Sequence, residues 1–376
     1  MAIDELTAAV DELPLVDHHV HGALRSPVDR AGLEGMLTES DRPIPGWMTQ
    51  FDSQLGFAVR RWCAPVLGLP PHADAADYVA RREELGVHEV TCRLLAASGV
   101  EHFLVETGYE GDAILSPAEM AASSGARADE VVRLETVLED LARSEVSAEE
   151  LPARFPELLA ERTVDAVGLK SVVAYRFGFD FDPQRPSTSE VVAAAGRWLR
   201  TGGRVDDPVL LRFLLWSGVD RGLPLQLHAG YGDPDIELHR CDPALLTRFI
   251  KLVEPHGVDL LLLHCYPYHR NAGYLAQAFP HVYFDVGLAV NHTGARSAAV
   301  VAESLELAPF AKLLFSSDAW GPPELHHLGA LLWRRGMRAA LAQWVTADEW
   351  SASDAIRVAR MIGRDNARRI YRLDQR

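Results

Sequence analysis

The chain has 376 residues, a formal net charge of −16 at pH 7 and 48% hydrophobic residues. This length and apolar content suit one large domain with a substantial core. The negative charge disfavours nucleic acid and anionic membranes as partners, and no stretch reaches the ~18 apolar residues of a membrane span.

The N-terminus and the cysteines bear on the compartment. Residues 1–5 are acidic and are not followed by the apolar core of a signal peptide. The four cysteines show no CxxC spacing and no disulfide density. They are Cys63, Cys92, Cys241 and Cys265. We therefore expect a cytoplasmic protein in a reducing environment.

Short apolar runs recur along the chain and predict buried parallel strands. The runs are 13–17, 102–106, 130–135, 167–170, 223–228, 259–264, 282–286 and 311–318. Segments with helical character lie between and after them, at 75–85, 148–161, 208–221, 243–254 and 324–371. Strands that alternate with helices imply an α/β fold with a parallel sheet, and eight such strands predict a (β/α)8 TIM barrel with a helical C-terminal tail.

Residues 26–74 interrupt this pattern after the first strand. They contain several prolines and aromatic residues, among them Trp47 and Trp62. We expect a largely helical insertion within a single domain that spans residues 1–376. Above the C-terminal face of the barrel it would form a lid or an oligomer contact, and an extra packing layer is the alternative.

Two histidines stand at the end of the first run. His19 and His21 are separated by one residue, and residues i and i+2 of a strand point to the same side. Two imidazoles at this spacing can hold one metal ion, while a pair of buried, hydrogen-bonded histidines is the alternative. The same alternation turns His18 to the other face, where we expect a structural role.

Four further residues of metal-binding or catalytic type end later runs. They are Lys170, His228, His264 and Asp318. The C-terminal ends of the strands are where a (β/α)8 barrel carries its chemistry. The sequence therefore predicts that these side chains meet the two histidines at one face of the barrel.

This ordered set, HxH, Lys, His, His and Asp, resembles the motifs of the amidohydrolase superfamily from about residue 13 to residue 371. The resemblance is strongest to the amidohydrolase-related branch that includes the domain fused to glutamine synthetase in some fungal and plant proteins. The segments that carry it are Gly168-Leu169-Lys170-Ser171, Tyr175-Arg176, His228 to Asp233, His264 to Tyr268, and Asn366-Ala367 with Tyr371. The resemblance leaves the substrate open, because one fold hosts many reactions.

The resemblance implies one or two divalent metal ions. His19, His21 and Asp318 would hold one ion, and His228 and His264 would hold a second or complete a mononuclear site. These ligands suit Zn, Mn and Fe alike. In dinuclear members of the superfamily a carboxylated lysine on strand four bridges the metals, and the resemblance gives that place to Lys170. A bare lysine is protonated at neutral pH, so a cation that binds a substrate carboxylate is the alternative.

Asp318 and the residues near it suggest the reaction. In a hydrolase Asp318 would accept a proton from the attacking water and pass it to the leaving amine, while a helix N-cap is the alternative role. Tyr175 and Arg176 are expected to bind a substrate carboxylate, with Tyr231 and Trp320 as further substrate contacts. The leading prediction is hydrolysis of a C–N bond in a small, carboxylate-bearing amide.

Two other functions stay open. His239, His269 and His292 follow strands five to seven and add candidate ligands, His239 above all. Such a surplus is similar to an oxygen-activating offshoot of the superfamily that holds two iron or manganese ions and hydroxylates small substrates such as 2-aminoisobutyrate. A non-catalytic metal-binding subunit is the other possibility. We expect a homo-oligomer or a pair with a homologous subunit.

Overall fold

The computed structural model describes residues 2–375 and contains a sheet of seven parallel strands, each paired with the next along the chain. The strands are β1 (Leu15–Val20), β2 (Val100–Glu106), β3 (Arg127–Arg133), β4 (Gly168–Ser171), β5 (Leu225–Ala229), β6 (Leu260–His264) and β7 (Val282–Phe284). Seven of the eight predicted strands are therefore present, with ends that differ by a few residues. Most of their residues are buried, as expected for strands covered on both faces.

The eighth predicted strand, 311–318, is an irregular extended segment that closes the sheet. On one side Leu313 forms a parallel bridge with Phe284 of β7. On the other side the backbone N–H of His18 in β1 donates to the carbonyl of Phe315, at 3.2 Å. The segment therefore lies between the last strand and the first, and the predicted (β/α)8 barrel is confirmed.

The inside of the barrel is filled by side chains and does not form a channel. A separate apolar cluster there combines strand residues with the end of the chain: Val16, Leu104, Val131, Val167, Leu261, Leu263, Tyr283, Leu314, Ala367, Ile370, Tyr371 and Leu373. The C-terminal residues thus close the barrel at this end.

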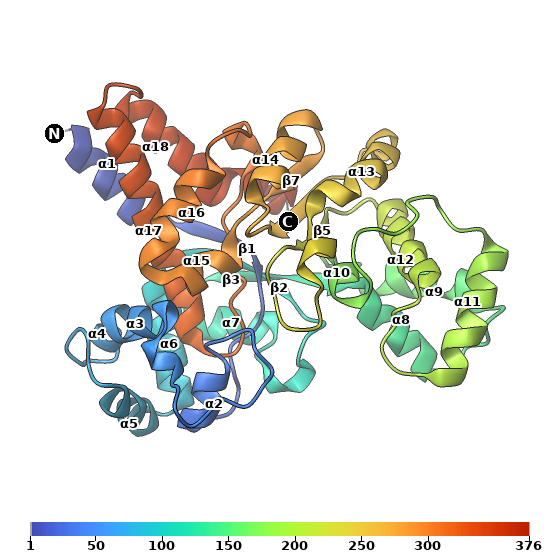
Figure 1. Cartoon of the computed structure of the whole chain (residues 1–376), viewed down its shortest axis with the longest axis horizontal. Coiled ribbons are helices and arrows are strands. Elements are labelled where there is room, and N and C mark those ends of the chain that lie inside the picture. Colours follow the sequence, from blue (N-terminus) through green and yellow to red (C-terminus); the bar gives the residue numbers. More distant parts are fainter. Residues whose placement is uncertain (1, 376) are drawn as a thin grey trace.

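Helices surround the barrel (Figure 1). They are α1 (Ala2–Asp11), α5 (Ala75–Leu85), α6 (Val87–Ser98), α7 (Pro117–Ser124), α8 (Leu134–Arg143), α9 (Leu151–Arg162), α10 (Val173–Arg176), α11 (Thr188–Thr201), α12 (Pro208–Arg221), α13 (Thr247–Val253), α14 (His269–Ala278), α15 (Gly287–Thr293), α16 (Ser297–Ser304), α17 (Pro323–Thr346), α18 (Ala352–Arg360) and α19 (Asn366–Ile370). None of the helices described between residues 2 and 375 is both long and apolar enough to span a membrane.

Local sequence signals explain where several helices begin and end. The Asp207 carboxylate caps α12 by accepting from the backbone N–H of Val209, and Pro208 occupies the first turn. Gly222 ends this helix with φ +75°. The predicted ranges 75–85 and 208–221 are confirmed by α5 and α12, whereas 243–254 breaks into 3₁₀ turns around α13.

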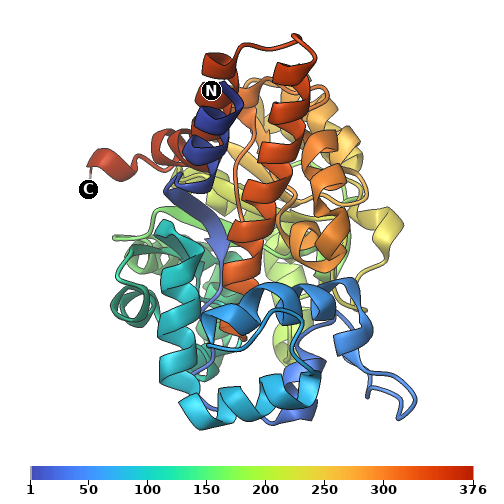
Figure 2. The same ribbon diagram turned by 90° about the vertical axis from the view of Figure 1, so that its left-hand side faces the viewer.

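The insertion at 26–74 contains α2 (Arg30–Gly35), a 3₁₀ turn, and α3 (Gln54–Ala58) joined to α4 (Ala64–Val66) by a π-helical segment (Val59–Cys63). Residues 36–49 between α2 and α3 form no helix, so the segment is only partly helical. Figure 2 shows it in light blue, packed with α5 and α6 at one end of the molecule.

Candidate metal centre and its pocket

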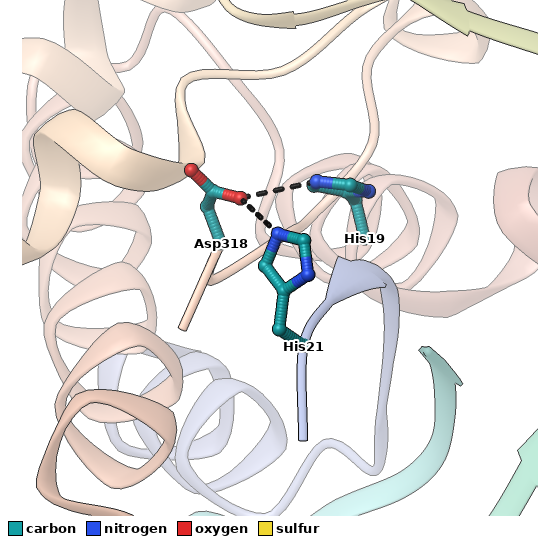
Figure 3. A group of neighbouring side chains, drawn as sticks. All are labelled: His19, His21 and Asp318. Atoms are coloured by element: carbon teal, nitrogen blue, oxygen red, sulfur yellow. Dashed lines mark ion pairs between the residues drawn. The ribbon is translucent and has the colours of Figure 1, made fainter. Parts of the chain in front are cut away.

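Three predicted ligands meet in the structure. The carboxylate of Asp318 lies 3.1 Å from Nε2 of His19 and 3.8 Å from Nε2 of His21, measured to Oδ1 (Figure 3). One potential ligand atom from each residue lies within 4.8 Å of the other two. This spacing is suited to one cation held by two imidazoles and one carboxylate.

An irregular β1 places the histidines. Its pairing with β2 shifts register between Asp17 and Val20, as a β-bulge does. The bulge corrects the prediction for His18, because strict alternation fails here. The ring of His18 reaches Tyr371 of the interior cluster, with 3.0 Å between Nδ1 and the hydroxyl oxygen. His18 is structural, as expected, but it lies on the same side as His19.

His264 and His228 complete a ring of imidazoles. The centroid of the His264 ring lies 5.4 Å from that of His19 and 4.7 Å from that of His228. Nε2 of His264 is 3.4 Å from Oδ2 of Asp318. Leu263 belongs to the interior cluster, so alternation would turn the next side chain outward. A positive φ of +68° at His264 brings it inward instead.

Lys170 reaches the same cluster. Its Nζ lies 3.0 Å from Nε2 of His19, and the side chain is buried. Burial lowers the pKa of Lys170 to about 8, although Asp318 and Glu106 oppose this shift. A lysine with a lowered pKa has a larger neutral fraction, which is the form that reacts with CO2. Its place suits both the carbamate bridge and the cationic role, and both stay open.

The donor set fits a divalent metal ion. Burial is the largest cause that lowers the pKa of His19, His228 and His264 well below the usual value, so these rings are neutral at pH 7. Buried nitrogens of His228 and His264 have no hydrogen-bond partner among the described residues. An unpaired buried polar atom is costly, and a metal ion would satisfy these lone pairs.

Several residues that support the site were missed from the sequence. Gln226 Oε1 lies 2.8 Å from Nδ1 of His19, and its Nε2 donates to the hydroxyl of Tyr371 at 2.7 Å. The backbone N–H of His264 donates to Asp285, whose carboxylate also lies 3.0 Å from His18. Gln226 and Asp285 are polar residues within the apolar runs 223–228 and 282–286 of the sequence, and this signal could have revealed them.

A second support lies beside His21. Its Nδ1 is 3.2 Å from Oε2 of Glu106, and Arg133 donates to the same carboxylate at 2.5 Å. Arg133 lowers the pKa of Glu106 against the effect of burial, so the carboxylate is ionised. Glu106 ends the second predicted strand. Functional residues of such a barrel lie at the C-terminal ends of strands, which is how His228 was predicted, so the same argument could have identified Glu106.

A pocket of about 110 Å³ opens beside the metal ligands. His21, Lys170, His228 and Asp318 are among its lining residues. Three of the four predicted substrate contacts also line it, namely Tyr175, Arg176 and Trp320. Tyr231 is not among the lining residues and packs against His292, with ring centroids 5.5 Å apart.

The surplus histidines do not join the cluster. The side chain of His239 is 79% exposed and lies 3.8 Å from Glu237, so the structure does not support it as a ligand. It lies within a short 3₁₀ turn at the surface (Leu238–Cys241), so its nearness in sequence to strand five misled the prediction. His269 pairs with Glu303 at 2.8 Å. His292 lies 3.4 Å from Glu39, which lines the pocket.

Gly232 is required by close packing in this pocket. A Cβ at this position would lie 2.2 Å from the Tyr175 hydroxyl and 3.0 Å from Nε2 of His228. The rings of Tyr175 and His228 themselves lie 4.3 Å apart. The absence of a side chain at Gly232 therefore lets the loop after β5 approach a predicted ligand and a predicted substrate contact.

This chain is similar in sequence to one known protein and similar in fold to several solved structures. Protein fluG of Emericella nidulans is 32% identical over 255 residues, which are 63% of this chain but only 29% of that protein. A proposed metal-dependent hydrolase from Lactobacillus casei ATCC 334 superposes with a TM-score of 0.88 at 27% identity, over 98% of both chains. A uronate isomerase from Bacillus halodurans C-125 shares the fold, with a TM-score of 0.66 at 14% identity over 98% of this chain and 96% of its own.

A family model described as amidohydrolase matches residues 148–373, which is more than half of the chain. The matched region contains Lys170, His228, His264 and Asp318, four of the residues that the barrel brings together. The remaining two, His19 and His21, meet Asp318 in space. The chain belongs to the amidohydrolase superfamily.

Proposed function

We propose that this protein is a metal-dependent hydrolase that cleaves the C–N bond of a small, carboxylate-bearing amide. The observation that carries the proposal is the position of Arg176 in the pocket of the imidazole cluster. The Arg176 side chain is 8% exposed, and its buried Nε and Nη1 have no hydrogen-bond partner among the described residues. The carboxylate of a ligand would satisfy one of these N–H groups with a charge-assisted hydrogen bond.

The residues around the pocket have distinct roles in such a reaction. A divalent ion bound by the cluster supplies Lewis acidity and lowers the pKa of water. Asp318 is placed to take a proton from the attacking water and to return it to the leaving nitrogen. Burial raises the pKa of Asp318 and Lys170 opposes this rise, so the carboxylate is a better proton acceptor than an exposed aspartate. Arg176 would bind the substrate carboxylate and so position the amide bond near Asp318.

The similarity to the Lactobacillus casei protein supports a hydrolase, because that protein is described as a proposed metal-dependent hydrolase and superposes over 98% of this chain. The hydroxylase alternative relied mainly on His239 as an additional ligand. Since His239 is exposed at the surface, this specific support is absent.

The test uses zinc-loaded and iron-loaded protein with a panel of small carboxylate-bearing amides, with and without oxygen. We expect amide cleavage by the zinc form without oxygen, because hydrolysis involves no redox change at the metal. His264→Ala should abolish turnover and bound metal, whereas the matched variant His239→Ala should retain both. Oxygen uptake coupled to hydroxylation, seen only with iron or manganese, would refute the proposal. Absence of any turnover across the panel would favour the non-catalytic alternative.

A further inference from the structure

Two carboxylates that line the pocket form no ion pair with an arginine or a lysine among the described residues. Glu39 comes from the insertion and Asp233 from the loop after β5, and both line the pocket. Glu39 lies 3.4 Å from Nε2 of His292, and Asp233 accepts from the backbone N–H of Asp235 at 2.8 Å. Among residues 2–375, neither forms an ion pair with an arginine or a lysine.

These two carboxylates influence each other. Burial raises the pKa of Asp233, and the charges of Asp235 and Glu39 raise it further. A cationic group on a ligand would relieve this repulsion between like charges.

Neighbouring arginines compensate these charges only in part, since the charge of Arg204 lowers the pKa of Asp233 but does not overcome the effect of burial. Arg133 is engaged by Glu106 at 2.5 Å, and Arg204 by Asp235 at 2.7 Å. Arg176 has Glu139 at 3.4 Å from Nη2, but its buried Nε and Nη1 are unsatisfied within the described chain. The pocket therefore presents a nearly buried cation with unsatisfied donors as well as two carboxylates that form no ion pair with an arginine or a lysine of the described chain.

We propose that the substrate is zwitterionic, with an ammonium group held by Glu39 and Asp233 and a carboxylate held by Arg176. The proposal rests on the amidohydrolase function above and narrows the substrate class to amides built on an amino acid. The pocket of about 110 Å³ is small, so one compact ligand can contact both kinds of group. Glu39 gives the insertion a role in specificity, as the part of the chain that recognises the ammonium group.

The experiment measures ligand binding by calorimetry to the zinc-loaded protein, so it does not depend on turnover. The ligands are matched pairs that differ in one amine: glutamate and glutarate, aspartate and succinate, and glutamine and glutaramate. We expect the amine-bearing member of at least one pair to bind tenfold or more tightly. Glu39→Gln and Asp233→Asn should each reduce that preference to less than threefold, while binding of the partner without the amine stays unchanged.

Amino acids also chelate zinc, so the decisive contrast is between protein variants. Asp41→Asn is the matched control, because Asp41 lies on the same loop as Glu39 but already pairs with Arg42 at 3.2 Å. It should keep the full preference. Equal binding within every pair, no binding at all, or an unchanged preference in both pocket variants would overturn the proposal. A protein that binds amino acids in this way but cleaves no amide would contradict the proposed hydrolase and leave the zwitterion site standing.

Discussion

The backbone at two metal-site residues is held in a conformation that side chains other than glycine rarely adopt. His264 has φ +68° and Asp318 has φ +50°. A left-handed backbone at such residues costs on the order of 1–3 kcal/mol, which the surrounding structure must offset. At His264 the offset includes a hydrogen bond from its backbone N–H to Asp285. The sequence placed both residues at strand ends, but it could not show that the backbone turns there to aim them inward.

Lys170 is the residue whose role is most directly testable. Because its Nζ lies 3.0 Å from a predicted ligand nitrogen, Lys170→Ala is expected to lower kcat/KM at least 100-fold. To separate the two roles, kcat/KM of this variant is measured by steady-state kinetics with and without added acetate or propionate. Partial restoration supports a carbamate bridge, since a short carboxylate can take its place, and no restoration supports the cationic role. Unchanged activity would contradict both.

At the scale of elements, the C-terminal helix α19 is coupled to the metal cluster through Tyr371. The Tyr371 hydroxyl contacts both His18 and Gln226, and Gln226 in turn orients His19. Groups that orient metal ligands typically contribute 10- to 100-fold to metal affinity. Only the folded chain shows this coupling, because 353 residues separate His18 from Tyr371.

Tyr371→Phe is therefore expected to weaken metal binding by about tenfold, with the fold retained. Competition with a chromophoric chelator measures the affinity, and circular dichroism checks the fold. Tyr274→Phe is the control, because Tyr274 is 55% exposed on α14. Equal affinity in wild type and Tyr371→Phe would show that this network does not position His19.

Helix α17 carries a buried histidine outside the metal cluster that should affect stability at low pH. Burial lowers the pKa of His327 to about 4. As pH falls below about 6.5, the unfolded chain gains a proton at this residue while the folded chain does not, so the free energy of unfolding decreases. This loss amounts to about 1.4 kcal/mol per pH unit and ends near pH 4, where the folded state is also protonated.

His327→Gln removes this term and leaves all other titrating groups in place. The difference in unfolding free energy between wild type and variant should therefore shrink by about 3 kcal/mol between pH 7 and pH 4. Urea unfolding of both proteins at several pH values measures it. A difference that stays constant with pH would mean that His327 titrates alike in the folded and unfolded states.

Across the whole molecule, the sequence order of strands and ligand-type residues predicted the barrel and most of the cluster, because parallel strands bring their C-terminal ends to one face. What could not be predicted depends on side chains that are distant in sequence. Glu39 reaches the pocket from an irregular part of the insertion, and Arg133 reaches Glu106 from the neighbouring strand. His239 shows the converse, since its nearness in sequence to strand five did not bring it to the site.

Metal loading should stabilise the whole chain, because the cluster exists only in the folded state. The buried nitrogens of His228 and His264 have no hydrogen-bond partner within the described chain, so the metal-free fold bears a desolvation cost that an ion would remove. At a free metal concentration 100 times Kd, binding to the native state adds about 2.7 kcal/mol.

For a chain of 376 residues we expect the unfolding temperature to rise by roughly 3–4 °C on metal addition. Calorimetric scans of chelator-treated protein with and without added zinc measure the change. His264→Ala should lose most of the increase, because one ligand is missing, and His239→Ala should keep it, because that side chain lies at the surface. An equal rise in both variants would place the stabilising ion elsewhere on the molecule, and no rise in the wild type would contradict a metal centre in the barrel.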